Sequence, residues 1–200
     1  MFTLIDTINR LQSLPLNVVL TGGPCAGKTS LINRLKTLGF NTIPEQAIRV
    51  IDRLQLEMGA THFCHWRIHH PFEFQEMILQ AQRNAEKTTQ KDNMTFLDRG
   101  RLDGLAYLSH HRVGFSHAFR DKALISTFTY QVIVNCETLT AFAERKHTGR
   151  NESKNESSAL FKVLGRTYAS HGYTVLPLPS VDLEVRLSLM LNALARLLGE

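Results

Sequence analysis

The sequence has few cysteines and no long hydrophobic run, and each shortage excludes a class of protein. Three cysteines in 200 residues, Cys25, Cys64 and Cys136, are an odd and scattered set, unlike the paired framework of a disulfide-rich secreted domain. No stretch approaches the roughly eighteen consecutive apolar residues that indicate a membrane-spanning helix. The first residues lack a basic segment followed by an unbroken apolar one, so no secretion signal is expected. We therefore expect a reduced, cytoplasmic protein without a membrane partner.

The sequence also lacks any block of like charge. Its 23 basic and 18 acidic residues give a formal net charge of +5. A basic surplus suits a polyanionic partner, which includes nucleic acid and the triphosphate of a nucleotide. Because no run of five or six like charges marks a nucleic-acid-binding arm, nucleic acid is not the expected partner. We interpret the surplus of basic residues mainly as part of a phosphate-binding site. The length suits a single domain that spans residues 1–200.

Short apolar runs alternate with amphipathic stretches, which is typical of an α/β protein with a parallel sheet covered by helices. The predicted strands are Asn17–Thr21, Asn41–Ile43, Met94–Asp98, Gln131–Asn135 and Tyr173–Leu176. The predicted helices are Lys28–Leu38, Glu45–Glu57, Phe72–Thr89, 101–110, 117–127, 137–146, 157–170 and 181–198. Residues 60–71 are expected to be irregular.

The segment TGGPCAGKTS, residues 21–30, follows the first predicted strand and leads into the first predicted helix. Residues 22–29 match the phosphate-binding pattern G-x-x-x-x-G-K-[ST] at every fixed position. Gly22 allows a tight turn, and Gly27 leaves room for phosphates to approach the backbone N–H groups. Lys28 places an ammonium between the outer phosphates, and Thr29 offers a hydroxyl to Mg²⁺. The predicted ATP-binding residues are Gly22, Gly23, Pro24, Cys25, Ala26, Gly27, Lys28, Thr29 and Ser30.

Asp98 ends the third predicted strand and is the candidate carboxylate for the Mg²⁺ shell. The alternative is that Asp98 caps the next helix, although Asp103 is better placed for that task. Arg99 and Arg101 follow directly and either contact an anionic group of the substrate or pair with acidic side chains.

Glu45 comes directly after Pro44, at the end of the second predicted strand. The carboxyl ends of parallel strands line one crevice, so Glu45 and Asp98 are expected near the phosphate-binding loop. There a carboxylate can take the proton from an acceptor hydroxyl. Alternatively, Glu45 is an acidic residue in the first turn of a helix and complements the helix dipole.

The polar segment Lys146–Ser158 (KHTGRNESKNESS) is either a plain surface loop or a mobile lid over an active site. If the segment is a lid, which would cover residues 145–158, Arg145 and Arg150 are candidates to offset charge on a transferring phosphoryl group. The alternative is that both are solvated surface charges.

A group of histidines and one cysteine occupies residues 62–70. The spacing H-x-C-H-x-x-x-H-H lacks paired ligands around a compact turn, and no second cluster completes a four-ligand set, which disfavours zinc. A surface segment is the preferred interpretation, or else a wall of an acceptor pocket that uses Phe63 and Trp66.

Together, the segments TGGPCAGKTSLINRLKTLGF, IPEQAIRVI, FLDRGRLDGLAY and HGYTVLPLP resemble the AAA_28-type P-loop family of small ATP-binding proteins. That family is related to the nicotinamide riboside kinase domain of a bifunctional regulator of NAD biosynthesis. The resemblance implies a three-layer P-loop fold of the nucleoside- and nucleotide-kinase kind, with parallel strand order 2-3-1-4-5 and helices on both faces. It also implies Lys28 and Thr29 on ATP·Mg²⁺, Asp98 near the metal, Glu45 and Arg99 on the acceptor side, and Arg150 in the lid. The Asn- and Ser-rich lid of this sequence departs from the family pattern.

Two functions follow from these residues. The first is an ATP-dependent kinase that moves the γ-phosphate to a small hydroxyl-bearing acceptor, such as a nucleoside or a nucleotide. The second is a nucleotide-dependent regulatory or binding module with slow hydrolysis of ATP or GTP. The fourth predicted strand continues as VNCE and lacks the Asn-Lys-x-Asp motif that would read guanine, which disfavours a GTP-specific switch.

Overall fold

The computed structural model describes residues 4–89, 92–140 and 153–199. None of the helices within these ranges combines the length and the apolar character that crossing a bilayer requires.

The described residues build one five-stranded parallel sheet, in the order β2-β3-β1-β4-β5. The strands are β1 (Asn17–Thr21), β2 (Asn41–Ile43), β3 (Thr95–Asp98), β4 (Val132–Cys136) and β5 (Thr174–Leu178). The three central strands, β3, β1 and β4, are buried almost throughout, which explains why each reads as an apolar run rather than an alternation. The predicted strand order is confirmed, and all five carboxyl ends lie at the same edge.

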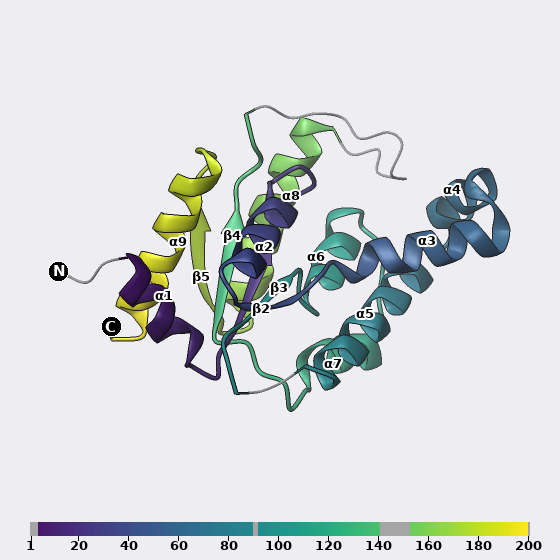
Figure 1. Ribbon diagram of the computed structural model, residues 1–200. Helices are drawn as coiled ribbons and strands as arrows, with labels where there is room; N and C mark the ends of the chain where they lie inside the picture. The colour runs from purple at the N-terminus through teal and green to yellow at the C-terminus, as the bar shows by residue number, and fades with distance from the viewer. Residues whose placement is uncertain (1–3, 90–91, 141–152, 200) are drawn as a thin grey trace.

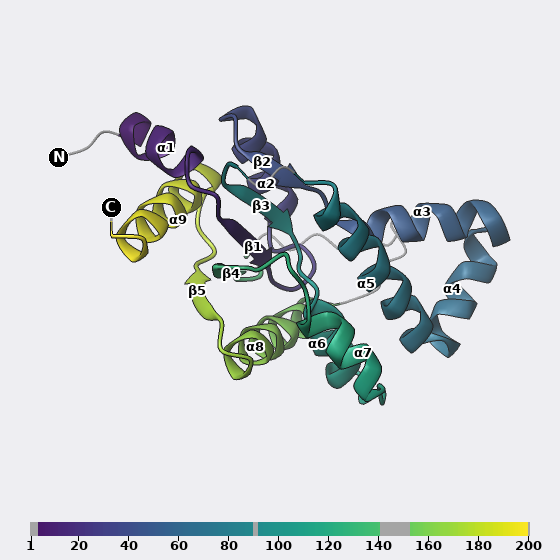
Figure 2. The same ribbon diagram turned by 90° about the horizontal axis from the view of Figure 1, so that it is seen from below.

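Helices cover both faces of the sheet (Figures 1 and 2). They are α1 (Leu4–Gln12), α2 (Lys28–Thr37), α3 (Gln46–Met58), α4 (Ala60–His69), α5 (Pro71–Lys87), α6 (Asp103–His110), α7 (His117–Leu124), α8 (Lys154–Ser170) and α9 (Leu183–Leu197). Helices α1, α2 and α9 pack on one face, and α6 and α8 pack on the other. Helices α3 and α4 extend away from the sheet and form a lobe with α5.

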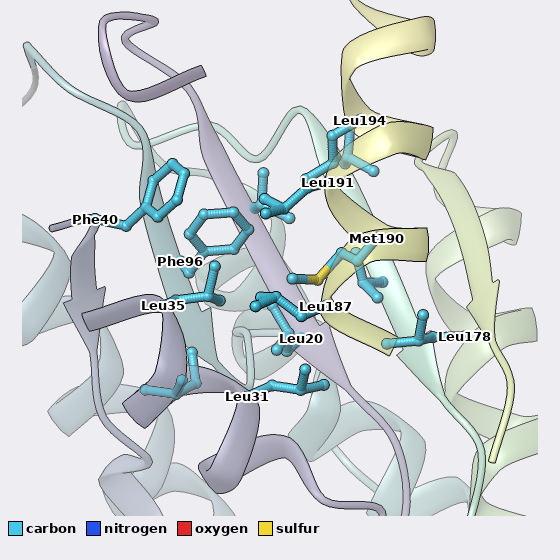
Figure 3. Packing of buried hydrophobic residues seen from close by; sticks show 14 of the residues in the cluster. Leu20, Leu31, Leu35, Phe40, Phe96, Leu178, Leu187, Met190, Leu191 and Leu194 are labelled. Atoms are coloured by element: carbon cyan, nitrogen blue, oxygen red, sulfur yellow. The ribbon is translucent and has the colours of Figure 1, made fainter. Parts of the chain in front are cut away.

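The largest apolar cluster joins β1, β3 and β4 to α2 and α9 (Figure 3). Phe40 and Phe96 meet edge to face, with ring centroids 5.1 Å apart. In α9, Leu187, Met190 and Leu194 are buried, whereas Leu183 and Leu197 at the two ends of the helix are exposed. This packing fixes the start of α9 beside the start of α2, where the phosphate-binding loop ends.

The lobe of α3, α4 and α5 has a small core of its own, which includes Phe63 and Phe74 with ring centroids 5.9 Å apart. The expectation that residues 60–71 are irregular is wrong, because Ala60–His69 is helix α4. Gly59, with a φ of +83°, separates α4 from α3, and Pro71 begins α5. Phe63 is the buried residue of α4, so the segment carries no apolar period that could reveal a helix.

Three other elements differ from the sequence-based prediction. Helix α1 was not predicted, although Leu11 buries completely in the core cluster. Residues 137–140, expected to begin a helix, are not helical, and the rest of that predicted helix lies outside the described residues. In the predicted lid, residues 154–158 form the first turn of α8 rather than a loop. Ser153 and Glu156 explain that early start, because they form a capping box.

Candidate active site

The P-loop, residues 22–29, connects the end of β1 to the start of α2. Gly22 has a φ of +137°, and a Cβ built there would lie 2.4 Å from the backbone oxygen of Cys136. Gly27 has a φ of +72° at the N-cap of α2, and Cys25 also has a positive φ, of 56°. The loop therefore depends on glycine for both its backbone shape and its close approach to β4.

Side chains from several elements hold the carbonyl groups of the P-loop. The buried Lys28 Nζ donates to the carbonyl oxygens of Gly22 and Gly23, at 2.9 Å each. Ser157 Oγ of α8 donates to the oxygen of Pro24 at 2.6 Å. Arg186 Nη1 of α9 donates to the oxygen of Ala26 at 2.7 Å. The sequence does not indicate Ser157 or Arg186, because both lie far along the chain outside any motif.

Thr29 and Asp98 meet at the carboxyl end of β3. Thr29 Oγ1 donates to Asp98 Oδ2 at 2.9 Å, and among the described residues the buried Oδ1 of Asp98 has no hydrogen-bond partner. Burial raises the pKa of Asp98, and the nearby Lys28 opposes that rise. A hydroxyl beside a carboxylate with a spare oxygen is a ligand set that suits Mg²⁺. The expected juxtaposition is present, and helix capping by Asp98 is wrong, since α6 begins after Leu102 without a side-chain cap.

Replacing Asp98 with asparagine should stabilise the nucleotide-free protein at neutral pH. Because burial raises its pKa, the carboxyl of Asp98 stabilises the fold at low pH, and this contribution is lost as the pH rises through the raised pKa. Asn cannot ionise, so at neutral pH the variant should unfold at a higher denaturant concentration than the wild type. In acid the variant should have no such advantage in stability over the wild type. Urea titrations in the presence of a metal chelator at both pH values measure this. A variant less stable at neutral pH would contradict it.

Glu45 and Arg99 form a buried ion pair between the ends of β2 and β3, with Arg99 Nε 2.7 Å from Glu45 Oε1. Glu45 occupies the N-cap position of α3, but its carboxylate makes no cap hydrogen bond there. Arg99 has a φ of +78°, a backbone conformation that is costly for a non-glycine residue and persists when surrounding contacts hold it. Its Nη1 supplies such contacts to the oxygen of Gly22 at 3.3 Å and to Asp103 at 3.2 Å.

Asp103 is not the helix cap that the sequence predicted. Its carboxylate accepts hydrogen bonds from Thr21 Oγ1 at 3.0 Å and from the hydroxyl of Tyr168 at 2.7 Å. Burial and the neighbouring Asp103 raise the pKa of Tyr168 well above its ordinary value, so this hydroxyl stays a donor. Asp103 therefore holds Arg99 in a network that joins β1, α6 and α8.

A pocket opens on the side of Glu45 and Arg99 that faces the helical lobe. Its wall also includes Phe74 and Gln75 of α5 and Tyr107 of α6. A larger adjoining cavity of about 390 Å³ shares Arg67, Phe74, Gln75 and Tyr107 with it. Its lining combines the ion pair of Glu45 and Arg99 with aromatic and amide side chains. This combination makes the space a candidate acceptor site.

Helix α4 contributes to this wall through residues other than those the sequence suggested. Cys64, Arg67 and Ile68 line the larger cavity, whereas Phe63 is buried in the core of the lobe. Within the described ranges, no group of three or more histidine, cysteine or acidic side chains is placed to hold a metal ion.

A sequence model for the family described as an AAA domain, AAA_28, matches residues 17–186. The chain belongs to the AAA_28 family. No curated protein matches it. Among solved structures, it is similar to a deoxyadenosine kinase from M. mycoides with bound dATP, at a TM-score of 0.65 and 15% identity over 90% of this chain and 99% of the other. The same enzyme with the products dCMP and a flexible dCDP matches at a TM-score of 0.53 and 13% identity, over 91% and 100%. At such identities the likeness shows the fold.

In this AAA_28 domain Arg101 pairs with an acidic side chain, which was one of its two expected roles. Its buried guanidinium forms an ion pair with Glu86 and donates to the carbonyl oxygens of Ala123 and Phe128. Tyr130 donates to the same Glu86, and its ring lies 4.4 Å from the Arg101 guanidinium carbon. Arg101 thus fixes the turn that carries Arg99. Arg145 and Arg150, the predicted lid arginines, lie outside the described residues.

Replacing Arg101 with methionine should lower the free energy of unfolding by about 3–5 kcal/mol, because the buried Glu86 loses its counter-charge. Denaturant titration measures the loss. The matched control is Arg34→Met, which removes an exposed ion pair with Glu184 and should lower the free energy of unfolding far less. Equal losses in the two variants would contradict the assigned role of the Arg101–Glu86 pair.

Proposed function

We propose that this AAA_28 protein is an ATP- and Mg²⁺-dependent kinase that phosphorylates a hydroxyl group of a small acceptor such as a nucleoside or nucleotide. The observation that carries the proposal is that Arg99 contacts both sides: it donates to the Gly22 carbonyl of the P-loop and pairs with Glu45 of the adjoining pocket. A nucleotide loop and a pocket that share one residue suit transfer between two bound molecules better than nucleotide binding alone. The fold of deoxyadenosine kinase supports the same proposal.

On the donor side, backbone N–H groups of residues 22–30 would hold the phosphates of ATP, and the ammonium of Lys28 would hold the outer ones. Mg²⁺ would be held by Thr29 and Asp98, whose spare oxygen suits it, and would supply charge neutralisation on the phosphates. Lys28 is already buried beside this pair, so its position costs little reorganisation on binding.

On the acceptor side, Glu45 would accept the proton of the attacking hydroxyl. Arg99 holds that carboxylate in place, and Asp103 in turn holds Arg99, so the geometry is set before the acceptor binds. We further propose that Arg150 offsets charge on the transferring group.

The decisive experiment is a panel of nucleosides, nucleotides and sugars, each incubated with the protein, ATP and Mg²⁺. A kinase releases ADP faster when its acceptor is present, and the acceptor gains the mass of a phosphate. ADP release that stays slow with every compound would reject the kinase and favour the regulatory module with slow hydrolysis.

A further inference from the structure

Arg186, in the first turn of α9, is a fully buried cation behind the P-loop. Its side chain is only 1% exposed, and it is one of the largest fully buried side chains in the described part of the protein. Nη1 donates to the oxygen of Ala26 at 2.7 Å, and it would lie 2.8 Å from a Cβ built on Gly27. The guanidinium therefore touches the loop where it enters α2.

Among the residues that the structure describes, no acidic side chain pairs with Arg186. Its buried Nε and Nη2 have no hydrogen-bond partner within these residues. Arg99 and Arg101 are also buried but behave differently, since Arg99 pairs with Glu45 and Asp103, and Arg101 pairs with Glu86. Burial of an unpaired charge carries a large desolvation penalty. One hydrogen bond to a carbonyl compensates only part of it.

We propose that Arg186 is a positioning residue for the P-loop and that the polyphosphate of a bound nucleotide is the counter-charge of its guanidinium. The inference rests on the proposed function, because it requires that the loop binds a nucleotide. Arg186 acts through the Ala26 carbonyl and through its charge, which attracts the phosphates through the low-dielectric interior of the protein. The protein thus carries an unfavourable buried charge that nucleotide binding relieves.

The test is Arg186→Met, a change that keeps the bulk of the side chain and removes its charge. We expect the nucleotide-free variant to be at least as stable as the wild type, because the desolvation penalty disappears. We expect its affinity for ATP·Mg²⁺ to fall about tenfold, equivalent to about 1.4 kcal/mol. Inorganic tripolyphosphate should lose affinity in parallel, since the interaction is with phosphate. Thermal unfolding and isothermal titration calorimetry give the two readouts.

Two further variants make the test specific. Arg186→Lys keeps the positive charge and should retain most of the affinity for both probes. Arg34→Met also removes an arginine between α2 and α9, but Arg34 pairs with Glu184, and its side chain is 39% exposed. This control should bind ATP·Mg²⁺ like the wild type.

Each outcome decides the matter. If the wild-type protein binds neither ATP nor tripolyphosphate, the proposed function fails, and the inference with it. If the wild type binds but Arg186→Met binds equally well, only the inference fails. A methionine variant that unfolds or loses stability shows that Arg186 is merely structural and also overturns the inference, as does a folded lysine variant that binds as weakly as the methionine one.

Discussion

Lys28→Met should lower ATP-dependent phosphoryl transfer by about 100- to 1,000-fold, the range seen when one preorganised charge stabiliser is removed. Lys28 is buried, and its Nζ is held by two P-loop carbonyls, so the ammonium is already fixed at the loop before ATP arrives. The variant also removes a charge that lowers the pKa of Asp98, so ionisation of the proposed Mg²⁺ ligand becomes harder. ADP release in the presence of the acceptor measures the loss.

Lys36 offers a matched control for that experiment. It lies on the same helix, α2, and is exposed. Lys36→Met should leave transfer unchanged. Full transfer by Lys28→Met would show that the P-loop lysine has no role in the reaction, and the proposed mechanism would then be wrong.

Glu45→Gln should leave ATP binding intact and slow transfer by about 100- to 10,000-fold, the usual contribution of a general base. Glutamine keeps an oxygen for Arg99 Nε, so the pocket retains its shape while the basic group is lost. The expected signature is a lower kcat with little change in the KM for ATP. Steady-state kinetics with each substrate varied in turn separates the two parameters.

Glu57 is the control for Glu45, because it also lies on α3 and forms an exposed pair with Arg53. Glu57→Gln should behave as the wild type. If Glu45→Gln transfers phosphate at the normal rate, Glu45 serves only to hold Arg99, and a different group takes the proton.

The sequence predicted the sheet well because its strands are short apolar runs that end in recognisable residues. The glycine pattern of residues 22–29 marked one strand end, and Pro44-Glu45 and Asp98-Arg99 marked two others. Parallel pairing then brings these ends together, as the register of Leu20 with Asp98 shows. Their roles in binding and catalysis, the single domain and the cytoplasmic location stay predictions.

Other parts of the site could not be predicted, and the reason is physical. Ser157 and Arg186 reach the P-loop across 133 and 160 residues of sequence, and a lone serine or arginine in an amphipathic helix carries no sign of such a contact. Asp103 was misinterpreted because its position suits a cap, while its carboxylate is taken by Thr21 and Tyr168 of distant elements. Only tertiary packing reveals these partners.

Helix α8 connects the P-loop to the pocket beside Glu45 and Arg99. Near its start Ser157 is hydrogen-bonded to Pro24 of the P-loop, and three turns later Tyr168 is hydrogen-bonded to Asp103, which pairs with Arg99. The side chains of Ser157, Tyr168 and Asp103, which form these hydrogen bonds, are all buried. The helical segment between the two contacts is about 16 Å long, and it sets the spacing between the P-loop and the pocket beside Glu45 and Arg99.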